Sequence, residues 1–259
     1  LGATYAISSL PSESSLRMLR RFAGTSRGDQ AFIGFGDPLL NHKDSPLQSG
    51  STQDSVSRAE ELRNHYDDLV NAGKELDSIA KSFRVDPDNL YLRHRFSETI
   101  IRSLELSRFR TVAFATHAAT AREFKWLQEP ALVLTPPNES TELDDGLLTA
   151  SEVAMLRLDA DWVILSACNT AAGDDTSHRG WLSGLARSFI YAGSRALLVS
   201  HWPIEDESSM TITTQMFLEY GAGNRVGRSE ALRRAMARTM LQYPHPAYWA
   251  PFSVVGDGR

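Results

Sequence analysis

Two side chains have the clearest chemical potential, one cysteine and one histidine. Cys168 is the only cysteine of the chain, and His117 lies 51 positions before it. Each follows a compact apolar stretch, so we expect each at the end of a buried strand. A thiolate is a nucleophile, and a neighbouring imidazole can favour it and later protonate the leaving amine. The pair therefore indicates acyl-transfer chemistry on a peptide bond.

The spacing of the pair sharpens this prediction. A single cysteine with a histidine about 50 residues upstream is typical of a caspase-like cysteine peptidase. Such a reaction needs donors aimed at the developing oxyanion, and the backbone N–H groups of Ala118 and Cys168 are the candidates. The alternative is that Cys168 is a small buried apolar residue and His117 a structural histidine. Their joint position after two strands favours the catalytic interpretation.

Composition limits the other classes of function. The chain has 259 residues, 42% hydrophobic and 23% charged, with a net charge of −5. This predicts an ordinary globular protein without a basic surface for nucleic acid. No stretch approaches the roughly 18 apolar residues of a membrane span. One cysteine excludes an internal disulfide and fits a reducing, cytoplasmic compartment. The scattered histidines form no HExxH or paired ligand spacing, so we expect no metal and no cofactor.

The elements that must position the pair follow from apolar runs and turn signals. We expect strands at 31–35, 90–92, 111–115, 131–134, 162–165, 196–199 and 252–255, and helices at 58–83, 97–105, 181–192, 207–220 and 229–241. Polar loops are expected at 41–57, 136–146 and 169–180. Thr149 and Glu152 have the spacing of a helix capping box. Residues 1–7 resemble a strand entered from upstream, so we expect a fragment of a longer polypeptide.

Strands that alternate with helices predict an α/β fold with a mainly parallel central sheet. In such sheets the ligand crevice lies beyond the carboxyl ends of the strands. Both His117 and Cys168 fall at such ends. No repeat or linker interrupts the pattern, which favours a single domain over residues 1–259.

Longer motifs carry a resemblance to a known family. The matching runs, in order, are Phe114-Ala-Thr-His117, Gly146-Leu-Leu-Thr-Ala-Ser-Glu152, Leu165-Ser-Ala-Cys-Asn-Thr170, Gly184-Leu-Ala-Arg-Ser-Phe189, Ala192-Gly193, Ser200-His-Trp-Pro-Ile-Glu-Asp206, Glu230-Ala-Leu232 and His245-Pro-Ala-Tyr-Trp-Ala250. They resemble the CHAT domain, a caspase-like peptidase module related to separase and often attached to tetratricopeptide repeats. The resemblance covers nearly the whole chain.

This resemblance implies a caspase–hemoglobinase three-layer α/β sandwich, with His117 as base and Cys168 as nucleophile. It also implies a protein substrate and upstream tetratricopeptide repeats as a possible partner. One departure is Ala118, because the family usually has glycine after the histidine. Alanine resists the positive φ that glycine accepts, so a positive φ here would strain the oxyanion site.

Substrate specificity depends on residues near the strand ends. In relatives such as separase, an acidic residue in the stretch that resembles 202–206 receives a basic P1 side chain, which implies this role for Asp206. Asp37 at the end of the first strand is a second candidate, since a carboxylate pairs directionally with arginine. Asp206 also fits a helix N-terminus. Ser200 and Trp202 can line the cleft and pair with an extended substrate backbone.

Three functions compete on these observations. The first is a cysteine endopeptidase that cleaves a specific protein, after a basic P1 residue. The second is a catalytically weak or inactive interaction module controlled by upstream repeats, which the Ala118 departure motivates. The third is another acyl-transfer enzyme such as a thioesterase, which the missing G-x-S-x-G elbow around Ser166 disfavours.

Overall fold

The computed structural model describes residues 4–10, 26–40, 53–69, 71–138, 140–141, 143–166, 184–202, 206–221 and 226–259, with only the backbone at 53–57, 206 and 221. The helices are α2 Gln53–His65, α3 Ala72–Ser82, α4 Glu98–Ser103, α5 Ala150–Met155, α6 Gly184–Tyr191, α7 Asp206–Gly221 and α8 Arg228–Gln242. The strands are β1 Ser8–Ser9, β2 Gln30–Gly36, β3 Leu90–Leu92, β4 Phe109–Ala115, β5 Ala118–Ala119, β6 Ala131–Val133, β7 Leu147–Thr149, β8 Trp162–Ser166, β9 Ala196–Ser200 and β10 Phe252–Gly256. Within these residues, none of the helices combines the length and apolarity needed to cross a bilayer.

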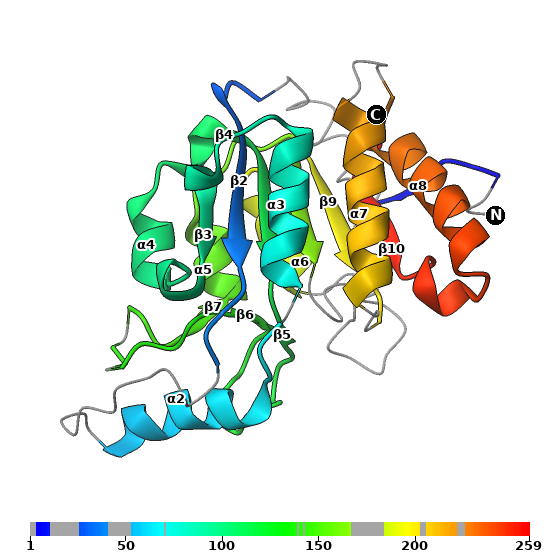
Figure 1. The fold of residues 1–259 in the computed structure, drawn as a ribbon. Helices are drawn as coiled ribbons and strands as arrows, with labels where there is room; N and C mark the ends of the chain where they lie inside the picture. The colour runs from blue at the N-terminus through cyan, green and yellow to red at the C-terminus, as the bar shows by residue number, and fades with distance from the viewer. Residues whose placement is uncertain are drawn as a thin grey trace.

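Seven strands form the central sheet, in the order β1-β10-β9-β8-β4-β2-β3. All neighbouring pairs are parallel except β9 with β10. Helices cover both faces, with α3, α7 and α8 on one side and α4, α5 and α6 on the other, as Figure 1 shows. This mainly parallel α/β sandwich confirms the predicted fold class.

The two faces of the sheet bury separate cores, because successive side chains of a strand point to opposite sides. Phe114 of β4 belongs to the core beneath α4, α5 and α6, which also contains Phe189. Its neighbour Ala113 belongs to the core beneath α3, α7 and α8, together with Phe217. Burial on both faces explains why these strands are continuously apolar in sequence.

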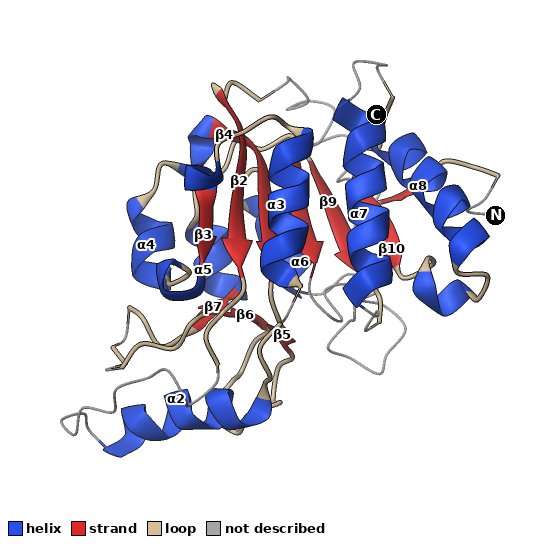
Figure 2. Ribbon diagram, in the orientation of Figure 1, coloured by secondary structure: helices blue, strands red, loops and turns tan. Residues whose placement is uncertain are grey.

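A second sheet of three strands, β5-β6-β7, lies below the carboxyl edge of β2 in the view of Figure 2. A third core packs this small sheet against α2, and it includes the fully buried Leu62 of α2 and Val133 of β6. The chain passes from β4 directly into β5 through Thr116 and His117. The small sheet is therefore the platform beside the histidine.

Local signals placed most of the elements correctly. Thr149 and Glu152 form the expected capping box at the start of α5. Gly193 follows α6 with φ 116°, and a Cβ there would lie 2.2 Å from the carbonyl oxygen of Leu158. The tight approach and the positive φ both require glycine at this helix end.

Three expectations were wrong. The helix expected over 58–83 is two helices, α2 and α3, separated by residues 66–71. The loop expected over 41–57 includes the first turn of α2, whereas residues 41–52 lie outside the described part. Residues 4–7 are not a strand, and pairing with β10 begins only at Ser8.

The break between α2 and α3 has a tertiary cause. The Leu40 backbone N–H donates to Asp68 Oδ1 at 2.9 Å, and the Asp67 carbonyl oxygen lies 2.7 Å from His117 Nε2. These contacts come from residues 28 and 50 positions away in the chain. They give the Asp67 carbonyl and the Asp68 side chain partners outside a helix and so override local helix propensity.

Candidate active site

The register of β4 and β8 fixes the relation between the two candidate segments. Thr111 pairs with Trp162 and Ala115 with Ser166. The pairing continues one residue further, where the Thr116 N–H donates to the Ser166 carbonyl at 3.2 Å. Every pair has the same offset in sequence, 51 positions, which also separates His117 from Cys168. Cys168 itself lies outside the described residues, as does the loop expected at 169–180.

His117 is held in a defined orientation after β4. Its Nε2 lies 2.7 Å from the carbonyl oxygen of Asp67. A carbonyl oxygen only accepts hydrogen bonds, so Nε2 carries a proton and donates it. In the neutral ring the basic nitrogen is then Nδ1. The His117 carbonyl accepts from the Val133 N–H at 2.9 Å, which fixes the backbone as well.

The residues that hold His117 were not identified in the sequence. Tyr66 stacks on the imidazole with ring centroids 4.8 Å apart and an interplanar angle of 26°. Tyr66 and Asp67 fall within the stretch predicted to be one continuous helix. No local signal distinguished them from surface helix residues, since their partner His117 is 51 and 50 positions away.

Ala118, the candidate oxyanion donor, lies in β5 opposite Leu132 of β6. Bonded and non-bonded positions alternate along an antiparallel pair. Because Val133 donates to His117, Ala118 occupies a non-bonded position and its N–H points away from β6. Ala118 is not among the residues with positive φ in the described part of the chain. Alanine therefore meets no strain at this position.

Asp37 lies at the same edge of the sheet, directly after β2. Its N–H donates to the Ala115 carbonyl at 3.2 Å, and its φ of 52° turns the chain away from the sheet. Its Oδ2 lies 3.5 Å from Arg93 Nη1. Burial raises the pKa of the Asp37 carboxyl, Arg93 opposes that shift, and Asp68 adds to it. An acidic group is thus present beside the end of β4.

The other specificity candidates follow β9, the neighbour of β8. Ser200 is the last residue of β9 and is buried, whereas Trp202 is 38% exposed and donates from Nε1 to the Ala247 carbonyl at 3.3 Å. Helix α7 begins at Asp206, which confirms the expected helix N-terminus there. The Asp206 side chain is outside what the structure describes. His201 Nε2 lies 2.8 Å from Ser253 Oγ of β10.

The end of β8 has a contact that sequence reasoning also missed. Ser166 Oγ donates to Glu75 Oε2 of α3 at 3.0 Å. Glu75 is only 6% exposed, although its side chain is ionisable and it lies on a helix. The contact joins residues that are 91 positions apart in the chain. Of these two residues, Ser166 lies two positions before Cys168.

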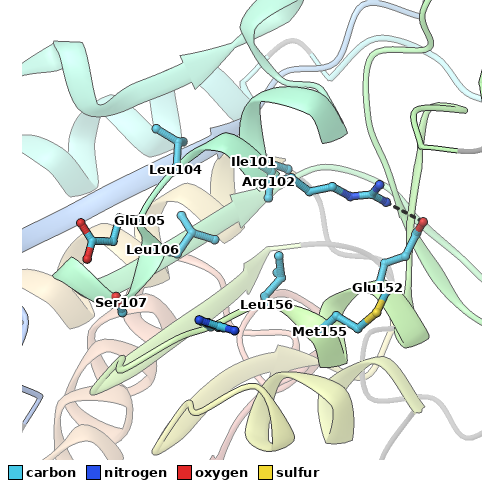
Figure 3. Close-up of a pocket in the computed structure, with 10 residues that line it drawn as sticks. Ile101, Arg102, Leu104, Glu105, Leu106, Ser107, Glu152, Met155 and Leu156 are labelled. Atoms are coloured by element: carbon cyan, nitrogen blue, oxygen red, sulfur yellow. Dashed lines mark hydrogen bonds and ion pairs between the residues drawn. The ribbon is translucent and has the colours of Figure 1, made fainter.

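A groove of about 520 Å³ lies at the other end of β4 (Figure 3). Ile101, Leu104 and Leu156 line it, with the Arg102–Glu152 ion pair of 2.7 Å along one side. Its residues come from α4, α5 and the turn that leads into β4. The groove is therefore separate from the edge that carries His117.

Comparison with solved structures defines the class of fold. The chain resembles the Arg-specific cysteine proteinase gingipain R, with a TM-score of 0.55 and 9% identity, over 95% of this chain and 52% of that one. It also resembles separase in the Saccharomyces cerevisiae separase–securin complex, with a TM-score of 0.54 and 14% identity, over 98% of this chain and 14% of that one. The fold is thus the caspase-like α/β sandwich of these proteins.

The family follows from the sequence itself. The CHAT domain model matches residues 1–257, and the chain belongs to the CHAT domain family. Tetratricopeptide repeat protein 28 is 27% identical in Mus musculus over 141 residues and 28% identical in Homo sapiens over 143 residues. Each match covers 54% of this chain and only 6% of the relative. The chain therefore corresponds to a small part of these curated relatives.

Proposed function

We propose that this chain is a cysteine endopeptidase that cleaves a protein substrate, with His117 as base and Cys168 as nucleophile. The observation that carries the proposal is the placement of His117, whose Nε2–H is bound to the Asp67 carbonyl so that Nδ1 is the basic nitrogen. The common offset of 51 between β4 and β8 supports an approach of Cys168 to that ring. We also propose that the 259 residues form a single domain.

The proposed reaction has two halves. The Cys168 thiol gives its proton to His117 Nδ1, and the sulfur forms a bond to the substrate carbonyl carbon. The N–H groups of Ala118 and Cys168 stabilise the oxyanion. When the C–N bond breaks, Nδ1 returns the proton to the leaving amine. Water then attacks the thioester with His117 as base, which releases the acid and restores the thiol.

We further propose a basic P1 side chain. Asp37 supports this, because its carboxyl lies at the edge of the sheet that carries His117. Asp206 at the start of α7 is the acceptor that the family resemblance implies, with Ser200 and Trp202 alongside the substrate backbone. The names of the curated relatives support tetratricopeptide repeats as a partner module in a longer chain.

The proposal is tested on fluorogenic peptides with P1 Arg, Lys, Asp or Leu, using the wild type and Cys168→Ala. We expect cleavage after Arg and Lys that Cys168→Ala abolishes while its thermal midpoint stays unchanged. A peptide electrophile with P1 Arg should label the wild type alone. The absence of both cleavage and labelling at Cys168 would contradict the proposal and favour an interaction module.

A further inference from the structure

The imidazole of His117 is held on one face and at one edge by two consecutive residues. Tyr66 stacks on the ring at 4.8 Å, and the next carbonyl, that of Asp67, accepts from Nε2 at 2.7 Å. Neither contact uses the nitrogen to which the proposed reaction assigns proton transfer. The stacked ring therefore limits rotation of the imidazole while leaving its chemistry in place.

Tyr66 is itself fixed by a polar cluster centred on Glu123. Its hydroxyl donates to Glu123 Oε1 at 2.6 Å, and His65 Nε2 lies 3.0 Å from the same oxygen. Glu123 Oε2 accepts from the N–H and hydroxyl of Thr120, at 2.7 and 2.9 Å. Burial would raise the pKa of Glu123, but the hydrogen bonds from Tyr66, Thr120 and His65 outweigh it and lower that pKa. The acceptor of the tyrosine hydroxyl is thus a carboxylate.

Apolar packing completes the support of Tyr66. Phe124 meets Tyr66 and His65 edge to face, at 6.1 and 5.0 Å between ring centroids. Phe124 is 7% exposed and belongs to the third core, with the buried Leu62 one turn before Tyr66. The Tyr66 N–H continues α2 by donating to the Leu62 carbonyl at 3.1 Å. The tyrosine is therefore part of a packed unit.

We propose that Tyr66, anchored by Glu123, is a positioning residue that orients His117 and stabilises its imidazolium form; this proposal rests on the proposed function. The face of an aromatic ring is electron-rich and attracts a cation stacked on it. A phenol that donates to a carboxylate gains electron density in its ring. The charge that appears on His117 when it takes the thiol proton is thus stabilised by a ring already in place.

The pKa of His117 reports this interaction without any need for turnover. We would measure it by NMR titration in Cys168→Ala, assigning the His117 signal by its loss in Cys168→Ala/His117→Gln. Adding Tyr66→Leu should lower the pKa of His117 by about half a unit, the scale of an exposed cation–π contact. Adding Tyr66→Phe, which keeps the ring, should lower it by less. The other titratable residues beside this ring, His65, Asp67 and Glu123, are not substituted in any of these variants.

Tyr91 of β3 provides a matched control, since it is also a tyrosine stacked on another ring, that of Phe35, at 5.4 Å. Tyr91→Leu should leave the pKa of His117 at its starting value. Equal shifts for Tyr66→Leu and Tyr91→Leu, or a larger shift for Tyr66→Phe than for Tyr66→Leu, would overturn the proposal.

A kinetic measurement in the protein with Cys168 intact separates this proposal from the proposed function. Tyr66→Leu should lower kcat about threefold with KM unchanged, because the lost contact forms fully only with the imidazolium. A rise in KM at constant kcat would contradict a positioning role. If the wild type has no activity, the proposed function fails, whereas the titration still decides the role of Tyr66.

Discussion

Two glutamates hold opposite ends of the small sheet, and they differ in the charge that their surroundings favour. Glu123 binds Thr120 just after β5, on the side of His117. Glu98 of α4 accepts from the N–H groups of Asp145 and Gly146, at 2.9 and 3.3 Å, just before β7. Each joins a loop to another part of the fold, so the two positions are directly comparable.

The difference between them comes from burial. Hydrogen bonds outweigh burial at Glu123 and lower its pKa, so it is a fixed anion at neutral pH. Glu98 is 1% exposed, and burial raises its pKa to about 8, although Arg102 lies 2.8 Å away. At Glu98, desolvation and the neighbouring carboxylates of Glu152, Asp145 and Asp144 outweigh the backbone hydrogen bond and favour the acid. The small sheet is thus held by a charged carboxylate, Glu123, near the candidate site and by a carboxyl whose charge depends on pH, Glu98, at its far end.

The largest effect should come from the Glu123 end, through His117→Ala. We expect kcat/KM to fall about 10³-fold, the scale of a lost general base. The pH midpoint for alkylation of Cys168 should move towards about 8.5, the value of an ordinary thiol. Iodoacetamide kinetics against pH would measure it, with the exposed His94→Ala as a control that leaves both quantities unchanged. An unaltered midpoint in His117→Ala would remove the proposed pairing with Cys168.

A smaller effect, on stability alone, should appear at the Glu98 end. The folded pKa of about 8 lies above the ordinary value of 4.5, so the folded state binds the extra proton between these values. The stability contributed by this proton is complete below pH 4.5 and is lost as the pH rises through 8. Glu98→Gln cannot ionise, so it should not lose this stability. The free energy of unfolding of Glu98→Gln relative to that of the wild type should therefore increase by about 2–4 kcal/mol from pH 5 to pH 8.

Urea unfolding at both pH values measures this gain, with the exposed Glu105→Gln as the control. Parallel pH profiles for Glu98→Gln and the wild type would mean that Glu98 is charged like Glu123. The two glutamates would then not differ in charge at neutral pH.

The sequence predicted what local signals encode. Continuous apolar runs located β4 and β8, and the ends of these two strands indicated His117 and Cys168 as the candidate pair. The break after α2 was missed because Asp67 and Asp68 leave the helix for partners elsewhere in the fold. The roles of Tyr66 and Glu123 depend on the same long-range contacts. Periodicity reports which face of an element is buried and contains no information on such pairs.

The smallest effect is expected at the end of β8, and it extends the comparison to the other half of the site. Ser166→Ala removes the 3.0 Å hydrogen bond to the buried Glu75 and should cost about 1–2 kcal/mol of stability. Alkylation of Cys168 should slow only a few-fold, because the backbone pairing of Thr116 with Ser166 remains. Ser103→Ala, which removes an exposed hydroxyl bonded to Ile100, is the matched control. A decrease in the rate of Cys168 alkylation as large as that in His117→Ala would show that the orientation of the thiol depends on this hydrogen bond as strongly as on its base.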